Sequence, residues 1–238
     1  MIYQILLVRL DIIHFIRKCF TIYLSDWRTK GCVGPVTNQG QCGSSTIFAV
    51  VGLVEGVHCV KSGKFVQLSY EQIVDCSGAG CTGSSFEQIY QYLIKAGGLE
   101  DAQSYPPSGA GGQCHFDPSK IVAKVSGYVN VESKNEQALQ QAVATIGPIG
   151  VAIDASHSSF QLYTGGGMYH VSFFLFYQLS FKMIYLVYNE AACSQVQLDQ
   201  SLLVVGYGSQ SNTDFWIVRN RYNSVCIYFE STEYFFMF

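Results

Sequence analysis

A serine, Ser45, stands at the start of a run of apolar residues whose spacing predicts a buried helix ending near Gly63. A nucleophile at a helix N-terminus is favoured in its anionic form by the helix dipole. A hydroxyl is far less acidic than a thiol, so a neighbouring base must remove its proton during attack. Ser45 could therefore do chemistry only where the fold supplies such a base. The apolar positions of this helix are Ile47, Phe48, Val50, Val51, Val54 and Val57.

The segment around Ser45 reads NQGQCGSSTIFA at residues 38–49. It resembles the active-site segment of papain-like cysteine peptidases, and of their cathepsin L branch in particular. In that family the position of Ser45 holds the nucleophilic cysteine, and the position of Thr46 holds a tryptophan. The resemblance implies that Gln39 and the backbone N–H of the nucleophile form the oxyanion hole. The chain thus carries the frame of a peptidase site without its thiol.

The base of the family lies in a Leu-Asp-His segment that precedes a strand reading VVGYG. This chain reads LDQSLLVVGYG at residues 198–208, so Gln200 occupies the histidine position. An amide side chain neither accepts nor stores a proton at neutral pH. The asparagine that orients the histidine corresponds to Asn220, which ends the segment FWIVRN. The match fails at the next three residues, so Asn220 has no imidazole to orient.

These substitutions predict a catalytically inactive chain. Loss of either member of such a dyad removes about six orders of magnitude in turnover. A hydrolase with a recruited base is the alternative, and the chain has five histidines to consider. His58 lies several turns from Ser45, and His157 matches a non-catalytic histidine of the family that we interpret as structural or exposed. We expect none of the five to act as the base: His14, His58, His115, His157 and His170.

The resemblance runs in family order over most of residues 26–169 and 189–220, which makes the family assignment specific. Residues 1–25, 170–188 and 222–238 do not match, and they hold ten of the sixteen phenylalanines. We hypothesise that these segments are translated intron or flanking sequence, because A/T-rich non-coding DNA read in frame yields Phe, Tyr, Ile and Leu. A genuine lineage-specific insertion is the competing explanation.

The resemblance implies an α+β, papain-like fold in two halves with a cleft between them. A helical half is expected over residues 26–118, and a β-barrel-like half over residues 119–221, interrupted by the aromatic insertion at 170–188. Residues 1–25 and 222–238 form the flanking segments. The strands that close the β half in the family do not follow Asn220, so we expect the fold to be incomplete at its C-terminus. Exposed strand edges would then lower solubility.

Local patterns predict the elements of each half. Helices are expected over 70–74, over 86–96 with a capping box of Ser85 and Gln88, and over 134–146 with a capping box of Ser133 and Glu136. Strands are expected over 121–131, 149–155, 202–208 and 214–219.

The position of six further residues in the family implies a substrate cleft for an extended peptide, with no cofactor. Gly83 and Ser84 stand where a Gly-Gly pair bonds the substrate backbone. The hydrophobic second subsite would be lined by Phe86, Ala152, Leu198 and Ser201. Phe86 has an equally good interpretation as a helix core residue.

Nine cysteines favour an oxidising compartment. The resemblance implies two disulfides, Cys42 with Cys81 and Cys76 with Cys114, and an endolysosomal or extracellular location. No segment reads as a signal peptide or propeptide. Cys193 matches a half-cystine whose family partner lies beyond the matching region, and three cysteines have no assigned partner: Cys19, Cys32 and Cys59. We expect no metal site, because no Cys-x-x-Cys or His-x-x-x-His spacing occurs.

Composition excludes two further classes. The net charge is −3 and Lys and Arg do not cluster, so nucleic acid is not an expected partner. Residues 171–188 are apolar but contain Lys182 and reach only the lower limit for crossing a bilayer, so a membrane span is not expected. The sequence therefore predicts a monomeric, catalytically disabled cathepsin L-like protein. The alternatives are an active cysteine-type endopeptidase misrepresented by a faulty gene model, and a non-proteolytic secreted binding or structural protein of this fold.

Overall fold

The computed structural model describes residues 3–5, 24–35, 44–108, 111–132, 134–161, 187–188, 190, 192–194, 196–210, 213–220 and 226–230. The helices are α1 (Ser45–Ser62), α2 (Tyr70–Cys76), α3 (Phe86–Ala96), α4 (Glu136–Thr145) and α5 (Ser158–Gln161), with a 3₁₀ turn at Pro118–Lys120. The strands are β1 (Tyr3–Ile5), β2 (Ser25–Asp26), β3 (Gly98–Glu100), β4 (Ile121–Lys124), β5 (Val129–Val131), β6 (Ile149–Ile153), β7 (Val187–Tyr188), β8 (Gln200–Gln210), β9 (Thr213–Arg219) and β10 (Cys226–Glu230).

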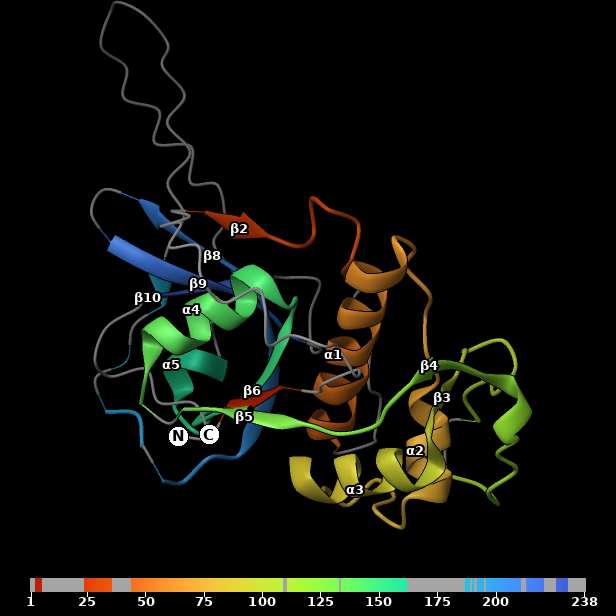
Figure 1. Ribbon diagram of the computed structural model, residues 1–238. Coiled ribbons are helices and arrows are strands. Elements are labelled where there is room, and N and C mark those ends of the chain that lie inside the picture. Colours follow the sequence, from red (N-terminus) through yellow and green to blue (C-terminus); the bar gives the residue numbers. More distant parts are fainter. Residues whose placement is uncertain are drawn as a thin grey trace, which may run out of the picture.

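The elements form two halves that meet at α1 (Figure 1). On one side lies a sheet with the strand order β5-β1-β6-β8-β9-β10-β7, to which β2 adds by pairing with β8. On the other side lie α2, α3 and the two-stranded sheet β3-β4. The predicted α+β fold class is confirmed.

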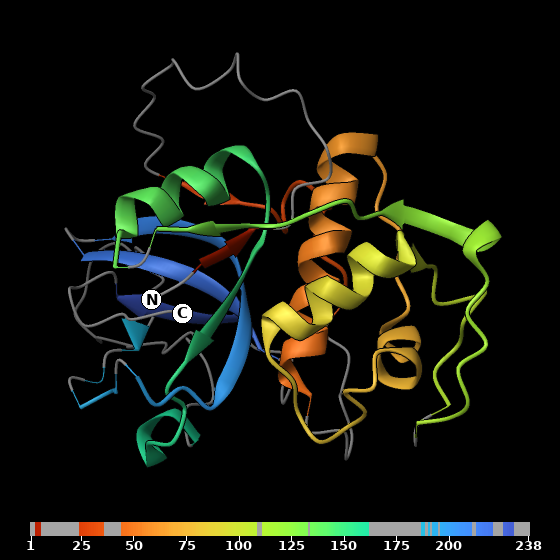
Figure 2. The same cartoon turned by 60° about the horizontal axis from the view of Figure 1, so that its bottom comes forward.

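Two hydrophobic cores lie on opposite faces of the sheet, and the alternation of side chains along β8 and β9 divides them. Leu202 and Val204 of β8 belong to the core under α4. Leu203 and Val205, one residue out of phase, belong to the core that contains α1. Trp216 and Val218 of β9 join the first core, as Phe215 and Ile217 join the second. Figure 2 shows α4 over one face of the sheet and α1 beside the other.

Helix α1 is buried along almost its whole length because it is packed by the sheet on one side and by α2 and α3 on the other. Its contact with the sheet is close: a Cβ on Gly52 would lie 2.8 Å from Cδ2 of Leu203, and one on Gly56 would lie 2.5 Å from Cδ of Pro148. The helix is long and apolar enough to cross a membrane by composition, but its apolar residues are accounted for by this core.

The ends of the predicted helices in the first half are confirmed. Gly63 ends α1 and Gly97 ends α3, each in the left-handed conformation that glycine adopts readily. The capping box of Ser85 and Gln88 opens α3 with both of its reciprocal hydrogen bonds. The short helix expected over 70–74 extends to Cys76.

The cap predicted for the helix over 134–146 is wrong. The helix is α4 (Glu136–Thr145), and its N-cap is Asn135, whose side chain accepts a hydrogen bond from the N–H of Ala138 at 2.8 Å. Lys134 precedes this cap with a positive φ of 58°. Ser133, the predicted cap, lies outside the described residues. The N-cap therefore lies two residues later than predicted, at an asparagine whose amide reaches the first turn.

The single strand predicted over 121–131 is also wrong, because the segment forms two strands in two different sheets. β4 pairs with β3 in the first half, and β5 pairs with β1 in the large sheet. Gly127 lies between them in irregular backbone. The chain thus passes from one half to the other inside a segment whose composition reads as one strand.

The flanking segments contribute strands that the sequence did not predict. β1 pairs with both β5 and β6, and β10 pairs with β9 over five residue pairs from Cys226↔Arg219 to Glu230↔Phe215. The expectation of an unpaired edge after Asn220 is therefore wrong for β9. A short strand needs only backbone hydrogen bonds to pair, as β10 does along β9 and β1 does between β5 and β6, so neither strand requires a family motif.

Candidate functional site

Ser45 is the first residue of α1 and is half-buried. Its Oγ accepts a hydrogen bond from the backbone N–H of Ser201 at 3.1 Å. Ser201 directly follows Gln200, so the fold brings the predicted nucleophile and base positions together although they are 155 residues apart in sequence. A backbone N–H facing the oxygen is a donor and cannot remove the proton of the hydroxyl.

A second hydroxyl pair joins the same two elements. Thr46 Oγ1 lies 3.1 Å from Ser201 Oγ, and both side chains are buried. Sequence reasoning assigned no role to Thr46 and placed Ser201 in the substrate cleft. The only available signal for this pair was the departure of Thr46 from the family's tryptophan. Ser201 is thus engaged with the N-terminal residues of α1 through both its backbone and its side chain.

Gln200 and Asn220 lie at the same edge of the sheet. Gln200 begins β8 and pairs with Ile153, the last residue of β6. β9 runs antiparallel to β8, with Arg219 paired to Leu203, so Asn220 follows β9 at the end where β8 begins. Both residues are half-buried. The positions of nucleophile, base and orienting residue therefore converge, whereas Gln39, the predicted oxyanion-hole residue, lies outside the described residues.

In the described part of the chain, the hydrogen bond recorded for Ser45 comes from a donor and none joins it to a proton acceptor. The first turn of α1 contains no acidic residue. Among the histidines that the structure describes, His58 lies near the far end of α1, and its pKa is lowered by burial and by Lys61. His115 stacks on Tyr105 in the other half, with ring centroids 3.8 Å apart. His157 lies after β6, with its Nε2 3.5 Å from Oδ2 of Asp154. None of these three has a hydrogen bond to Ser45 among the described contacts, and His14 and His170 lie outside the described residues.

The residues predicted for the second subsite lie along β6 and β8. Phe86 packs directly against β6, since a Cβ on Gly150 would lie 2.9 Å from its Cε1. Ala152 is on the same face of β6 as Gly150 and pairs with Ser201 across the strands. Phe86 is buried within the α1 core, so its role as a packing residue is observed. Leu198 is half-buried two residues before β8.

Gly83 and Ser84 precede α3. Gly83 is exposed, with a φ of 97°, and Ser84 carries a buried Oγ that has no hydrogen-bond partner in the described part of the chain. A pocket nearer the base position is lined by Phe48, Ala49, Ser201, Leu202, Leu203 and Arg219. Of the six predicted cleft residues, Ser201 is the one in this lining.

Two disulfides join described residues. Cys76–Cys114 is the predicted bridge, and Cys32–Cys59 is one for which the sequence assigned no partner. Cys81 is also disulfide-bonded, and its predicted partner Cys42 lies outside the described residues. The bridge between Cys32 and Cys59 ties the segment after β2 to the last turns of α1, so it fixes the C-terminal part of the central helix.

Comparison with known proteins gives concordant results. A model of the papain family cysteine proteases matches residues 24–228. The chain is 41% identical over 201 residues to digestive cysteine proteinase 2 of Homarus americanus, covering 83% of this chain and 56% of that protein. It is 41% identical over 205 residues to procathepsin L of Rattus norvegicus, covering 83% of this chain and 55% of that protein. The chain therefore spans about half the length of the curated relatives it matches.

The fold agrees with solved structures of the same kind. The structure of digestive procathepsin L 3 of the Tenebrio molitor larval midgut superposes with a TM-score of 0.76 at 32% sequence identity. The superposition covers 91% of this chain and 67% of that one. The digestive procathepsin L2 proteinase of the same source gives a TM-score of 0.75. The two halves around α1 are thus the architecture of these proteins.

Proposed function

Because the chain belongs to the papain family of cysteine proteases and has cathepsin L-like relatives, we propose that it is a catalytically inactive member that binds extended peptides between its two halves. The observation that carries this proposal is the contact of Ser45 Oγ with the backbone N–H of Ser201. The hydroxyl that would attack a peptide faces a donor, and the residue at the base position, Gln200, carries an amide. Neither group can generate the alkoxide that a serine needs.

In this proposal the chain has lost the nucleophile and the base but has kept the fold that positions them. α1, β6, β8 and β9 bring Ser45, Gln200 and Asn220 to one edge of the sheet. An oxyanion hole and substrate contacts without a nucleophile and base leave roughly a thousandfold acceleration over water, which is too slow for a digestive or degradative peptidase. Such a chain would retain binding and lose turnover.

The ligand class follows from the residues along β6. Ala152 pairs with Ser201 across β6 and β8, Leu198 is half-buried before β8, and the buried Phe86 packs behind Gly150, so we expect a peptide with an apolar residue two positions before the cleavage point to fit. Ser84 adds a side chain where the family has glycine, which narrows the approach of the peptide backbone. We therefore expect weak binding, with an affinity in the micromolar range or weaker, equivalent to about −8 kcal/mol at most.

The test compares the protein with its Ser45→Ala variant. A fluorogenic peptide amide with an apolar residue at the second position measures turnover, and the same peptide with a fluorophore and no scissile amide measures binding by anisotropy. We expect equal background turnover for the two proteins and retained binding in both. Turnover in the unsubstituted chain that disappears in Ser45→Ala would overturn the proposal, since Ser45 would then be a working nucleophile.

An oxidising compartment is part of the same proposal. The bridges Cys32–Cys59 and Cys76–Cys114 support secretion or an endolysosomal location, because disulfides do not persist in a reducing cytosol. Mass spectrometry of the protein from its source, alkylated before and after reduction, checks whether both pairs are oxidised.

A second candidate is an active cysteine endopeptidase whose sequence is misread at the catalytic positions. It is supported by the retention of Asn220 and of the whole frame around Ser45, and by relatives named as proteinases at about 40% identity. Sequencing of the spliced transcript separates the two candidates. Codons for Cys and His at positions 45 and 200 would establish the peptidase, and Ser and Gln in a clean message would leave the inactive protein.

A further inference from the structure

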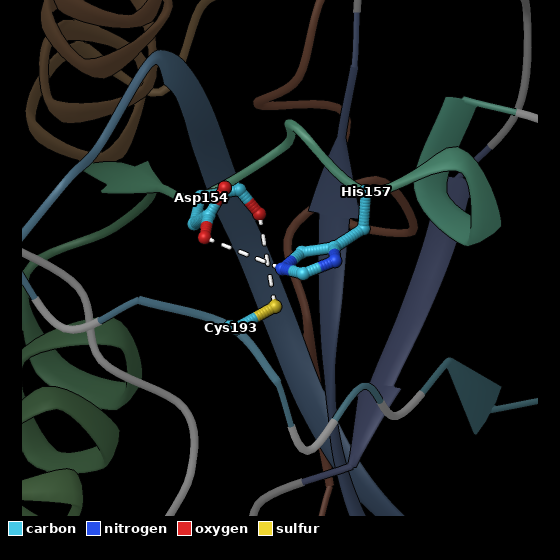
Figure 3. A group of neighbouring side chains, drawn as sticks. All are labelled: Asp154, His157 and Cys193. Carbon is cyan, nitrogen blue, oxygen red and sulfur yellow. Dashed lines mark hydrogen bonds and ion pairs between the residues drawn. The ribbon is translucent and has the colours of Figure 1, made fainter.

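A group of three side chains with different donor atoms lies at the end of β6 (Figure 3). It consists of Asp154, His157 and Cys193, and their carboxylate oxygen, imidazole nitrogen and sulfur all lie within 4.8 Å of one another. His157 Nε2 is 3.5 Å from Asp154 Oδ2, and Cys193 Sγ is 3.8 Å from the backbone oxygen of Asp154. This group could not be predicted from the sequence, because Cys193 is 39 residues from Asp154 and no metal-binding spacing links them.

The carboxylate of Asp154 is held in place from both sides. Its Oδ1 accepts hydrogen bonds from the N–H and the hydroxyl of Ser156, at 3.0 and 2.6 Å, and its Oδ2 accepts one from the N–H of Ser194 at 2.7 Å. These bonds fix the turn that carries His157 and the turn that carries Cys193 to one carboxylate. Outer hydrogen bonds of this kind orient the ligands of metal sites.

The charges around the thiol are negative. Burial and the carboxylates of Asp154, Glu190 and Asp199 raise the pKa of the Cys193 thiol to about 11. Asp154 itself is buried, which favours its neutral form, but the hydrogen bonds from Ser156 and Ser194 and the proximity of His157 outweigh this and hold its pKa below the ordinary value. The cluster therefore contains an anionic carboxylate and a thiol whose ionisation needs an added positive charge.

We propose that Asp154, His157 and Cys193 form a binding site for a zinc ion. Zn²⁺ is the divalent cation that accepts thiolate, imidazole and carboxylate ligands together, at about 2.0 to 2.3 Å. Two ligands of a tetrahedral zinc ion are about 3.5 Å apart by that geometry, which is the separation of His157 Nε2 and Asp154 Oδ2. Magnesium and calcium ions, which take mainly oxygen ligands, do not fit this donor set. Binding releases the thiol proton, because the metal ligand is the thiolate.

The proposed site is adjacent to the altered catalytic positions. Ile153, which precedes Asp154, pairs with Gln200 across β6 and β8. Asp199, which precedes Gln200, receives a hydrogen bond from the N–H of Ala155 at 2.7 Å. A metal ion with three protein ligands would stand at the edge of the same two strands, with its fourth position open to water or to a donor atom of a bound peptide.

Cobalt(II) is the probe for this site, because a tetrahedral cobalt–thiolate centre absorbs in the visible and near-ultraviolet ranges whereas zinc does not. The experiment adds Co²⁺ to the oxidised full-length chain and then displaces it with Zn²⁺. We expect visible absorption of a tetrahedral centre with a sulfur-to-cobalt band, both of which zinc abolishes. Cys193→Ser should remove the sulfur band, and His157→Gln should weaken zinc affinity by at least about tenfold.

The matched control is His58→Gln, which removes a histidine of α1 that is remote from the cluster and should leave both bands unchanged. Asp154 is kept, since its loss would free the N–H groups of Ser156 and Ser194 and could unfold the turns. Circular dichroism checks that each variant is folded. Unchanged cobalt spectra in Cys193→Ser, or absence of a tetrahedral spectrum in the unsubstituted chain, would refute the site. A disulfide at Cys193, found by alkylation before and after reduction, would refute it as well.

Discussion

Two polar groups lie at the same edge of the sheet and differ in what their side chains can do. At the first, Ser45, Thr46 and Ser201 offer hydroxyls near the start of β8, where Gln200 lies, and the contacts among these three residues are hydrogen bonds of neutral groups. At the second, Asp154, His157 and Cys193 offer three groups that titrate or bind metals. The strands β6 and β8 position both. The fold thus preserves the placement of reactive residues independently of whether those residues keep their chemistry.

The largest effect, on peptide turnover, should come from restoring a nucleophile and a base at the first group. Ser45→Cys with Gln200→His places a thiol at the start of α1 and an imidazole at the start of β8, next to Asn220. We expect peptide turnover to rise by at least about a thousandfold over the unsubstituted chain, because a nucleophile and base act as a unit worth about a millionfold. Hydrolysis of the fluorogenic peptide and labelling by a thiol-directed epoxide measure it.

The matched control for that change is Ser45→Cys with Gln200→Asn, which restores the thiol but supplies a second amide in place of the base. It should stay near the background rate. Equal turnover in both double variants would mean that the imidazole does not reach the thiol, and that the convergence of β8 and α1 is not close enough for catalysis.

The next effect concerns the disulfide Cys32–Cys59, which holds α1, the helix that carries Ser45 and Thr46 of the first group. Replacing Cys32 and Cys59 by serine removes a disulfide that closes 27 residues and should lower the free energy of unfolding by about 3.5 kcal/mol. Urea unfolding under non-reducing conditions measures the loss. The cobalt spectrum should not change, because the bridge is attached to α1 and not to β6. A spectrum that disappears below the unfolding transition would show that the cluster depends on the placement of α1.

The free energy of unfolding should depend on pH through two carboxyl groups, Glu136 and Asp154, whose pKa values are shifted in opposite directions. The effect of Glu136 is similar in size to that of the disulfide. Burial raises the pKa of Glu136 to about 7, against a smaller opposing effect of the hydrogen bond from Trp216 Nε1 at 2.7 Å. Since the folded pKa lies above the unfolded value near 4.5, this group favours folding below pH 4.5 and loses that contribution as the pH rises to 7. The decline should reach at most about 3 kcal/mol.

Glu136→Gln should flatten this decline, and Trp216→Phe should steepen it by removing the bond that favours the charged form. Unfolding free energies measured between pH 4.5 and 7.5 check both. Asp154, whose pKa is lowered, contributes in the opposite direction, with stability that is lost as the pH falls. A decline that survives unchanged in Glu136→Gln would assign it to another group.

How far the sequence predicted this structure depended on whether the determining signal was local. α1 and α3 were predicted closely because apolar periodicity and a following glycine mark each end within one turn of the chain. The cap of α4 was not, since Ser133 and Asn135 both suit the role. The break in the segment 121–131 was not predicted either, because strand-forming residues lie on both sides of Gly127, Ile and Val before it and Tyr and Val after it, and only the sheets reveal the crossing.

Which parts of the site could be predicted also depended on whether the signal was local in the sequence. Ser45, Gln200 and Asn220 were predicted as site positions because family motifs surround them, and their proximity in the structure follows from strands that those motifs also identify. The pair Thr46–Ser201, the bridge Cys32–Cys59 and the cluster at Asp154 have no motif. Each joins residues that are 27 to 155 positions apart, through the docking of α1 on β8 or through turns at the sheet edge. Such contacts are properties of the tertiary structure, which composition and spacing do not encode locally.

The smallest effect tests whether the hydroxyl pair couples α1 to β8 at the altered site. Thr46→Val leaves Ser201 Oγ buried without its partner and should cost about 1 kcal/mol, as should Ser201→Ala. The double variant should cost less than the sum of the two by about 0.5 to 1.5 kcal/mol, because both changes remove the same hydrogen bond. Thr46→Ser keeps the hydroxyl and should preserve the coupling. Additive losses would instead mean that Ser201 is held by its backbone hydrogen bond to Ser45 alone. The hydroxyl pair would then add little to the stability of the contact between α1 and β8.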